Sequence, residues 1–245
     1  MIAELLAKSG KSMLQGIPPD GKAYWAARYW DRAAAERHQV LSDEFLAQKD
    51  VIADLLRSHG AEAKYVLEFA CGTGAFTALA AELTPATEIR AVDISEQGLE
   101  RAGARVRHDN LRLVHGDFWA DNGLEPADLV MCIDAIHHLG DIREVLTRLR
   151  SFVAPGGVFI GNIWTVDHFH EFQRKRYGTL GHLRRTAAFF TTAMITRASG
   201  SRLKTGAYRT QLIHSAEALA ILHSVFGTGV EVRNQRYFMA FVCQV

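Results

Sequence analysis

A short stretch between positions 66 and 82, VLEFACGTGAFTALAAE, constrains the fold of this 245-residue chain more than any other. Its apolar beginning predicts a buried strand, the small residues and glycines predict a turn, and the residues after Gly74 have helical spacing. Gly72 and Gly74 let the backbone approach a ligand closely, and the N-terminus of the following helix favours a negative group. Together with Asp93, which ends the next predicted strand and can hold the hydroxyls of a ribose, the stretch indicates a ligand with a nucleoside part and an anionic end.

Alternating strand and helix patterns extend this unit over the middle of the chain. Short apolar runs predict strands at 65–70, 88–94, 111–117, 127–134 and 157–164. Helical patterns lie between them, after Gly74, after Ser95 and from Asp141 to Val153. Nearly continuous apolar strands separated by helices predict a parallel sheet that is covered by helices on both faces.

The N-terminal segment, residues 1–63, has no strand pattern and is predicted to be helical. Pro18 and Pro19 interrupt it, and helices are expected over 24–38 and 45–60. Four aromatic residues crowd the stretch YWAARYW at 24–30, and they cannot all face one side of a helix. We expect some of them to belong to the core and others to line a lid over the ligand.

The C-terminal part resumes the alternation after a gap. Residues 165–214 interrupt it and are expected to form an inserted helical cap, while residues 64–164 and 215–245 build the core. A helix over 215–226 is followed by two strand patterns with no room for a crossover helix between them. The last two strands must therefore pair antiparallel as a hairpin.

Charge and cysteine content narrow the classes of function. The chain has 28 Lys and Arg against 27 Asp and Glu, so its overall balance does not suggest a polyanionic partner. Residues 172–216, however, contain nine basic residues and no acidic one, which indicates either an anion-binding surface or a helix that faces solvent or another subunit. Three cysteines without metal or disulfide spacing fit a reduced cytoplasm, and neither a signal peptide nor a membrane-spanning apolar run is expected.

Two common nucleotide sites do not match the glycine turn. A dinucleotide fingerprint would place a third glycine at position 77, where the chain has Thr77. A phosphate-binding loop would need Gly-Lys-Ser or Gly-Lys-Thr, which the sequence lacks. An acidic residue, Asp93, ends the second predicted strand and can hold the hydroxyls of a ribose.

Five motifs at the predicted strand ends follow one another in a familiar order. They are Glu68-x-Ala70-x-Gly72-x-Gly74, Asp93, Asp117 with Phe118, the run Ile133-Asp134-Ala135-Ile136-His137-His138-Leu139, and Val153-Ala154-Pro155-Gly156-Gly157. In this order the chain resembles the class I S-adenosylmethionine-dependent methyltransferases over residues 64–161 and the terminal hairpin. The resemblance implies an α/β fold with a seven-stranded doubly wound sheet of order 3-2-1-4-5-7-6, in which strand 7 is antiparallel. It also implies S-adenosylmethionine as cofactor, S-adenosylhomocysteine as product, and no metal.

The resemblance assigns a cofactor role to most of these motif residues. Gly72 and Gly74 would line the methionine part, and Asp93 would bind the ribose hydroxyls. Asp117 would accept a hydrogen bond from the adenine amino group. The other expected cofactor contacts are Ile94 and Phe118 around the ring, Glu68 and Ala70 in the loop, Asp134, and the lid residues Tyr24 and Tyr29. The ordinary alternatives are helix-capping carboxylates for the aspartates and a core position for Phe118.

The candidates for chemistry and acceptor binding follow the fourth and fifth strands. Imidazole titrates near neutral pH, so His137 or His138 could take a proton from the acceptor; the alternative is that the pair belongs to the loop architecture. Asp134 could face the sulfonium or cap the helix that begins near Gly140. Asn162 and Trp164 are predicted at the acceptor mouth. In the insertion, His168 is a candidate acceptor contact; together with His170 it would suggest a metal only if a third ligand, such as His182, lay nearby.

The resemblance implies methyl transfer to a small, enclosed acceptor. The aromatic residues near the strand ends favour an aromatic or heteroaromatic metabolite, methylated on carbon, nitrogen or oxygen, in the biosynthesis of a secondary metabolite. One alternative is a tRNA methyltransferase that uses the basic insertion. Another is a cofactor-binding assembly module without turnover. A homodimer is suggested by the N-terminal helices of similar proteins, and neither a membrane nor a nucleic-acid partner is expected.

Overall fold

The computed structural model of the chain describes residues 2–30, 38–121, 123–203 and 210–245. Within this part, seven strands form one sheet of order β3-β2-β1-β4-β5-β7-β6. Their bounds are Tyr65–Phe69 (β1), Glu88–Asp93 (β2), Leu111–His115 (β3), Ala127–Cys132 (β4), Val153–Trp164 (β5), Val230–Asn234 (β6) and Phe238–Gln244 (β7). The predicted fold class and strand order are confirmed.

The pairing of the strands follows from the connections between them. Strands β1 to β5 are parallel because a crossover segment joins each to the next. Strand β7 runs antiparallel to both β5 and β6, with Phe159 opposite Cys243 and Val232 opposite Phe241. The predicted C-terminal hairpin is therefore present, and it reaches the edge of the sheet that is opposite β3.

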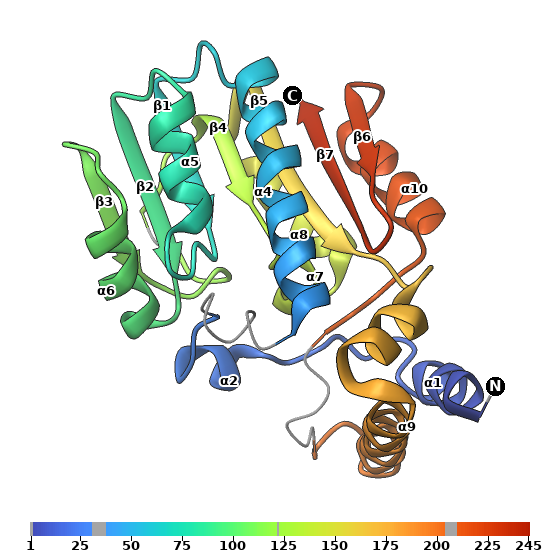
Figure 1. Cartoon of the computed structure of the whole chain (residues 1–245). Helices are drawn as coiled ribbons and strands as arrows, with labels where there is room; N and C mark the ends of the chain where they lie inside the picture. Colours follow the sequence, from blue (N-terminus) through green and yellow to red (C-terminus); the bar gives the residue numbers. More distant parts are fainter. Residues whose placement is uncertain (1, 31–37, 122, 204–209) are drawn as a thin grey trace.

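Helices cover both faces of the sheet, as Figure 1 shows. The helices α4 (Gln39–His59), α5 (Ala75–Leu83) and α6 (Glu96–Arg105) lie on one face, and α8 (Ile142–Ser151) and α10 (Ser215–Phe226) lie on the other. Side chains alternate between the two resulting cores. Ile160 packs with Ile52 of α4 in one, and Phe159 packs with Leu146 of α8 in the other.

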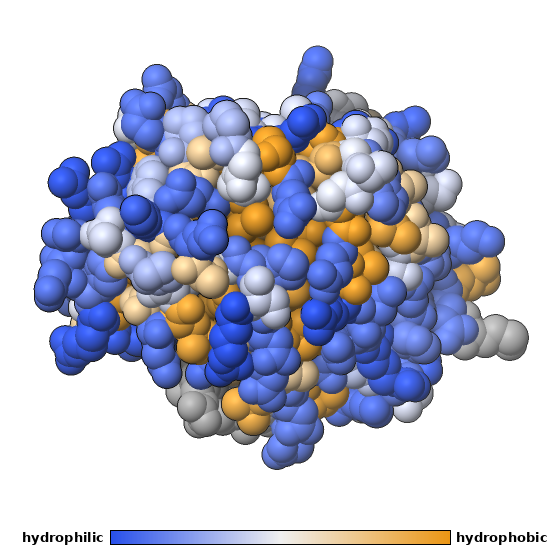
Figure 2. All heavy atoms as spheres, turned by 90° about the horizontal axis from the view of Figure 1, so that it is seen from above, coloured by the Kyte–Doolittle hydropathy of each residue, from blue (hydrophilic) through white to orange (hydrophobic). Residues whose placement is uncertain are grey.

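A second helical layer lies beyond the C-terminal ends of the parallel strands (Figure 1). It consists of α1 (Ile2–Met13), α2 (Lys22–Ala26) and α9 (Phe169–Ala198), with Ala193 of α9 packed against Leu14 and Ile17 after α1. Gly178 has φ 70° and ψ 170° and divides α9 into two helices that run in different directions. The predicted lid and inserted cap segments thus lie at the end of the sheet where ligands bind in parallel α/β folds. From the opposite end, hydrophilic residues form most of the rim, and apolar residues gather near the centre (Figure 2).

Three local predictions differ from the structure. The helix expected over 24–38 is only five residues long, Lys22–Ala26, within the described residues; positions 31–37 lie outside them. The Trp25 ring of this short helix packs against the His138 ring. Helix α4 begins at Gln39, earlier than expected, and β5 begins at Val153 because the backbone across Gly156, at φ 78°, stays in the sheet with a register shift.

Candidate functional site

The turn after β1 has an unusual backbone. Ala70, Gly72 and Gly74 have φ values of 55°, 54° and 72°, a left-handed region that side chains disfavour. A Cβ atom on Gly74 would lie 2.9 Å from the Cβ of Ala102, so this glycine permits the close packing of α5 and α6. A Cβ atom on Gly72 would meet nothing within 4 Å. The backbone at Gly72 therefore borders open space that a ligand can enter.

Asp93 fixes the position of this turn. Its two carboxylate oxygens accept hydrogen bonds from the Gly72 and Ser95 amides, both at 2.7 Å. Burial raises the pKa of Asp93, and the amide hydrogen bonds oppose this. The side chain remains 9% exposed, and each carboxylate oxygen has a further lone pair. The end of β2 and the glycine turn therefore form one unit that can still accept hydrogen bonds.

Glu68 lies beneath the turn and is buried. The hydroxyl of Thr77 donates to its carboxyl group. Burial raises the pKa of Glu68 to about 8, against the effect of that hydrogen bond, so the group is largely protonated at neutral pH. Thr77 is the residue in place of the third fingerprint glycine, and its hydroxyl has this structural use.

Asp117 lies past the end of β3, beside the neighbouring strand tip. It accepts from the Trp119 amide at 3.1 Å and pairs with Lys22 of α2 at 2.6 Å. Burial raises its pKa, but the Lys22 ion pair and the amide hydrogen bond outweigh burial and lower it. Phe118 is 5% exposed and packs edge-on against Phe69, so most of its ring belongs to the core. The sequence did not indicate a role for Lys22, because a lysine before a cluster of aromatic residues belongs to no recognisable motif.

Asp134 follows β4 with φ 59° and joins two other segments at the same end of the sheet. Its backbone amide donates to the Asn162 side chain at 2.5 Å, and its carboxylate accepts from the Trp164 indole and from Gln48 of α4. Burial raises the pKa of Asp134 to about 7, with these hydrogen bonds opposing. The helix-cap alternative for Asp134 is wrong, because Asp141 caps α8. Sequence reasoning also missed Gln48.

The two histidines of α7 (Ile136–Leu139) differ in exposure. His137 is 3% exposed, and its Nδ1 has no hydrogen-bond partner among the described residues. Burial, and then the neighbouring His138, hold the pKa of His137 well below its usual range, so it stays neutral. His138 is partly exposed, and its Nδ1 lies 3.0 Å from the Thr210 hydroxyl. His138 is therefore the one with access to solvent.

The N-terminal segment passes over these groups. The Trp25 ring lies 5.0 Å from the His138 ring, and Tyr24 packs edge-on against Trp25. Further along, the Arg101 guanidinium of α6 lies 4.5 Å from the centre of the Tyr29 ring. The segment thus reaches from α7 to α6 across the strand ends, which is the placement expected of a lid.

The histidines of the insertion do not form a metal site in the described residues. His170 and His182 are 3.0 Å apart through their ring nitrogens, but no group of three metal-binding side chains includes them. His168 is 3.8 Å from Glu171 and lies beside Tyr237. The Trp164 ring, by contrast, contacts Phe172 of α9 at 4.8 Å and links the insertion to the strand end.

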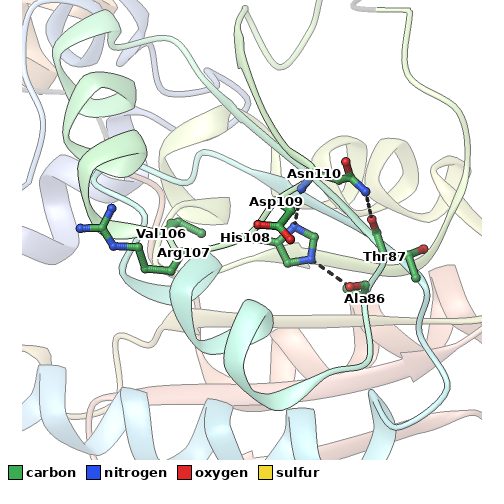
Figure 3. A pocket seen from close by; sticks show the side chains of 7 residues that line it. All are labelled: Ala86, Thr87, Val106, Arg107, His108, Asp109 and Asn110. Atoms are coloured by element: carbon green, nitrogen blue, oxygen red, sulfur yellow. Dashed lines mark hydrogen bonds between the residues drawn. The ribbon is translucent and has the colours of Figure 1, made fainter.

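A separate hollow of about 680 Å³ lies at the other end of β2 and β3 (Figure 3). It is lined by Ala86, Thr87, Val106, Arg107, His108, Asp109 and Asn110. His108 and Asn110 each pair there with a backbone carbonyl, those of Ala86 and Thr87, at 2.9 Å. These contacts join two loops at the N-terminal ends of the strands, so we assign the functional site to the glycine turn at the opposite end.

Among the described residues, no helix meets the length and apolarity that crossing a bilayer requires.

Comparison with known sequences finds similarity over the core. The profile of a family described as a methyltransferase domain matches residues 67–159. Malonyl-acyl-carrier-protein O-methyltransferase of Halalkalibacterium halodurans is 30% identical over 115 residues, 45% of this chain and 42% of that protein. Trans-aconitate 2-methyltransferase of Deinococcus radiodurans is 31% identical over 126 residues, 51% of this chain and 47% of that protein. The chain thus spans about half the length of these curated relatives.

Solved structures share the whole fold at low sequence identity. A complex of DhpI with S-adenosylhomocysteine has a TM-score of 0.56 and 22% identity, covering 86% of this chain and 91% of that one. A methyltransferase of Haloferax volcanii, solved with the Trm112 activator, has a TM-score of 0.58 and 15% identity, covering 86% and 95%. At such identities the likeness concerns the fold.

Proposed function

We propose that the core of the chain is a class I methyltransferase domain of the S-adenosylmethionine-dependent type, and that the protein transfers a methyl group from S-adenosylmethionine to a small-molecule acceptor; the matched methyltransferase-domain family and the strand order support this. One observation supports this most: Asp93 holds the Gly72 amide at the edge of open space, with Asp117 at the neighbouring strand tip. This arrangement combines a backbone that can approach a ligand with two carboxylates spaced along adjacent strands.

Different residues of the site bind different parts of the cofactor. In this proposal the remaining lone pairs of Asp93 accept from the ribose hydroxyls, and Asp117 accepts from the adenine amino group. Gly72 and Gly74 let the turn run alongside the methionine part. Glu68 holds the turn from below through Thr77 and orders the loop there. Tyr24 and Tyr29 belong to the segment that covers the site.

The reaction needs positioning more than it needs chemical groups from the protein. A nucleophilic atom of the acceptor attacks the methyl carbon in line, the carbon–sulfur bond breaks, and S-adenosylhomocysteine leaves with the electron pair. Holding two reactants in line can lower the barrier by roughly 7–11 kcal/mol. When the attacking atom carries a proton, His138 is the partly exposed base that can accept it, and the buried neutral His137 supports the ring of His138 at 4.3 Å.

The acceptor binds between the strand ends and the helical layer. Trp164 offers a fixed flat wall, because its indole is held by Asp134 and packed against Phe172. We therefore propose a compact acceptor with a planar body, of the kind found in secondary metabolites. Two curated relatives bear the names of methyltransferases for carboxylated acceptors: trans-aconitate, a small molecule, which supports a small acceptor, and malonyl on an acyl-carrier protein, where the acid is carried by a protein.

Transfer of a labelled methyl group tests this function. The protein is incubated with methyl-labelled S-adenosylmethionine and either a panel of planar small molecules or bulk tRNA. We expect label in a small-molecule product and none in tRNA. Asp117→Ala should reduce turnover at low cofactor concentration at least tenfold, whereas Asp109→Ala, in the hollow at the opposite end, should match the wild type.

Other results would assign the site differently. Label in tRNA would favour an RNA methyltransferase, and binding of S-adenosylhomocysteine without any product would favour a non-catalytic module. Equal activity of Asp117→Ala and wild type at every cofactor concentration would remove the cofactor role of Asp117.

A further inference from the structure

Arg176 of α9 is half-buried and lacks the partner that a buried charge normally has. Its Nε atom is buried without a hydrogen-bond partner, and the described residues offer its guanidinium no ion pair. The two preceding basic residues differ in this respect, because Arg174 pairs with Glu4 at 3.3 Å and Lys175 with Glu171 at 3.0 Å. Of three consecutive cations, the one that turns inward is the one without a carboxylate.

A second arginine adds to the positive charge at this place. The guanidinium of Arg176 lies 4.7 Å from the centre of the Tyr177 ring, and that of Arg185 lies 4.2 Å from the same ring. The turn of the backbone at Gly178 brings the two halves of α9 together in this way. Burial lowers the pKa of Arg176, and the charge of Arg185 adds to that effect. Contact with an aromatic face compensates a buried cation only in part.

The energetics of this arrangement point to a missing anion. Partial burial of a charge without an opposite charge beside it is unfavourable, and an apolar side chain of similar length would avoid that cost. A guanidinium also presents parallel N–H groups that match a carboxylate or phosphate in two hydrogen bonds. An anionic ligand would therefore relieve both the desolvation of Arg176 and its repulsion by Arg185.

Arg176 is one helical turn from Phe172, the residue of α9 that contacts Trp164 at the proposed acceptor site. The two side chains therefore project from the same face of α9. Phe172 contacts the Trp164 ring, whose indole donates to Asp134 at the end of β4. The Tyr177 ring, in turn, lies 5.4 Å from His38 at the start of α4. A ligand lying against Trp164 would thus have Arg176 one turn further from the sheet.

We propose that Arg176, with Arg185 beside it, binds an anionic group of the acceptor, a carboxylate or a phosphate. This inference rests on the proposed function and narrows its acceptor to planar or compact acids. It also explains part of the positive charge of residues 172–216 without a polyanionic partner, because two arginines can bind one anionic group.

Calorimetric titration tests the site directly. The full chain at low salt and neutral pH, saturated with S-adenosylhomocysteine, is titrated with malonate, with inorganic phosphate, and with the neutral malonamide. We expect at least one anion to bind and malonamide not to bind; the anion that binds tells carboxylate from phosphate recognition. Arg176→Met should lower the affinity for that anion at least tenfold, and Arg176→Lys should restore part of the lost affinity. Arg184→Met, an exposed change on the same helix, should stay within twofold of the wild type.

Thermal unfolding separates a ligand role from a structural one. Because Arg176→Met removes an uncompensated charge and keeps a side chain of similar length, its Tm should equal or exceed that of the wild type. The inference is overturned if neither anion binds the wild type, or if Arg176→Met binds the anion as the wild type does. It is also overturned if Arg176→Met loses several degrees of Tm and Arg176→Lys binds no better than Arg176→Met.

The same titrations distinguish this inference from the proposed function. If S-adenosylhomocysteine binds and Arg176→Met binds the anion as tightly as the wild type does, the proposed methyltransferase function is retained and the proposed anion site at Arg176 is wrong. If S-adenosylhomocysteine does not bind, the titration without it still reports on the arginines. Anion binding that depends on Arg176 would then keep the anion site while the methyltransferase function fails.

Discussion

Four carboxyl groups near the ends of β1 to β4 lie in different electrostatic environments. Glu68 and Asp134 are buried, with pKa values raised to about 8 and about 7, while Lys22 helps to lower the pKa of Asp117. Asp93 is held by two backbone amides. The sequence placed all four at strand ends, because apolar runs mark where strands stop. Their partners depend on segments far apart in the chain, such as Lys22 and Trp164, so they could not be read from spacing.

Glu68 makes stability depend on pH. Its pKa is raised from 4.5 to about 8, so the folded state binds more protons than the unfolded state between these values. Its stabilising contribution is complete below about pH 4.5 and is lost as the pH rises toward 8. Glu68→Gln removes this dependence. We expect the free energy of unfolding of the variant, relative to ligand-free wild type, to rise by on the order of a few kcal/mol between pH 5 and 8.

Denaturant unfolding at several pH values measures this difference. The exposed Glu82→Gln on the neighbouring helix α5 serves as the control and should run parallel to the wild type. Asp134 has the same sign of dependence and is present in all three proteins, so it cancels in the comparison. Parallel curves for Glu68→Gln and wild type would contradict a buried, protonated Glu68.

At the scale of elements, the connection from β1 to α5 contains the glycine turn on which the proposed cofactor site depends. The glycine turn could be predicted, since its residue types are those that a left-handed backbone requires. The short α2 could not be predicted, because the pattern of aromatic residues at 24–30 suits a helix; the contacts of Trp25 with His138 and of Tyr29 with Arg101 form only in the folded chain. The kink of α9 at Gly178 is likewise visible only in the folded chain.

The two glycines of the turn should differ in what a methyl group does to them. Gly74→Ala puts a Cβ 2.9 Å from Ala102 at φ 72°, so we expect it to destabilise the fold by about 2–4 kcal/mol through strain and overpacking. Gly72→Ala, at φ 54° with free space, should cost only about 1–2 kcal/mol. Its Cβ would enter the space of the ligand, and affinity for S-adenosylhomocysteine should fall at least tenfold.

Thermal unfolding and calorimetry on both variants check this contrast. A Gly72→Ala protein that binds S-adenosylhomocysteine as tightly as the wild type would show that no ligand passes that side of the turn. A Gly74→Ala protein of unchanged stability would contradict the close packing of α5 on α6.

On the scale of the whole molecule, the strand ends of the sheet carry the proposed cofactor site, and the helical layer of α1, α2 and α9 lies beyond them. The strand order was implied by the resemblance to a known family, and the antiparallel hairpin of the last two strands was predicted from the missing crossover; both are confirmed. The placement of α1 against α9 was not predictable, because amphipathic helices without a motif can pack in many ways. Lys22 pairs with Asp117, and Trp25 contacts His138, so the N-terminal segment is tied to two strand ends of the core.

Hydrogen exchange can follow this layer as the cofactor site fills. If α2 covers the site, S-adenosylhomocysteine should slow exchange of the amides at 22–26 at least severalfold, because opening would then expose bound ligand. The hairpin of β6 and β7 lies at the far edge of the sheet and should be unchanged. Equal protection of α2 with and without the ligand would contradict its role as a lid.

The central claim is that the glycine turn and the carboxylates at the neighbouring strand ends bind S-adenosylmethionine or its product. Calorimetric titration of the ligand-free protein with S-adenosylhomocysteine, and separately with NAD, measures this most directly. The account predicts one molecule of S-adenosylhomocysteine per chain, at least tenfold weaker binding by Asp93→Ala, and no binding of NAD. Binding of NAD in place of S-adenosylhomocysteine, or no heat from either, would contradict it.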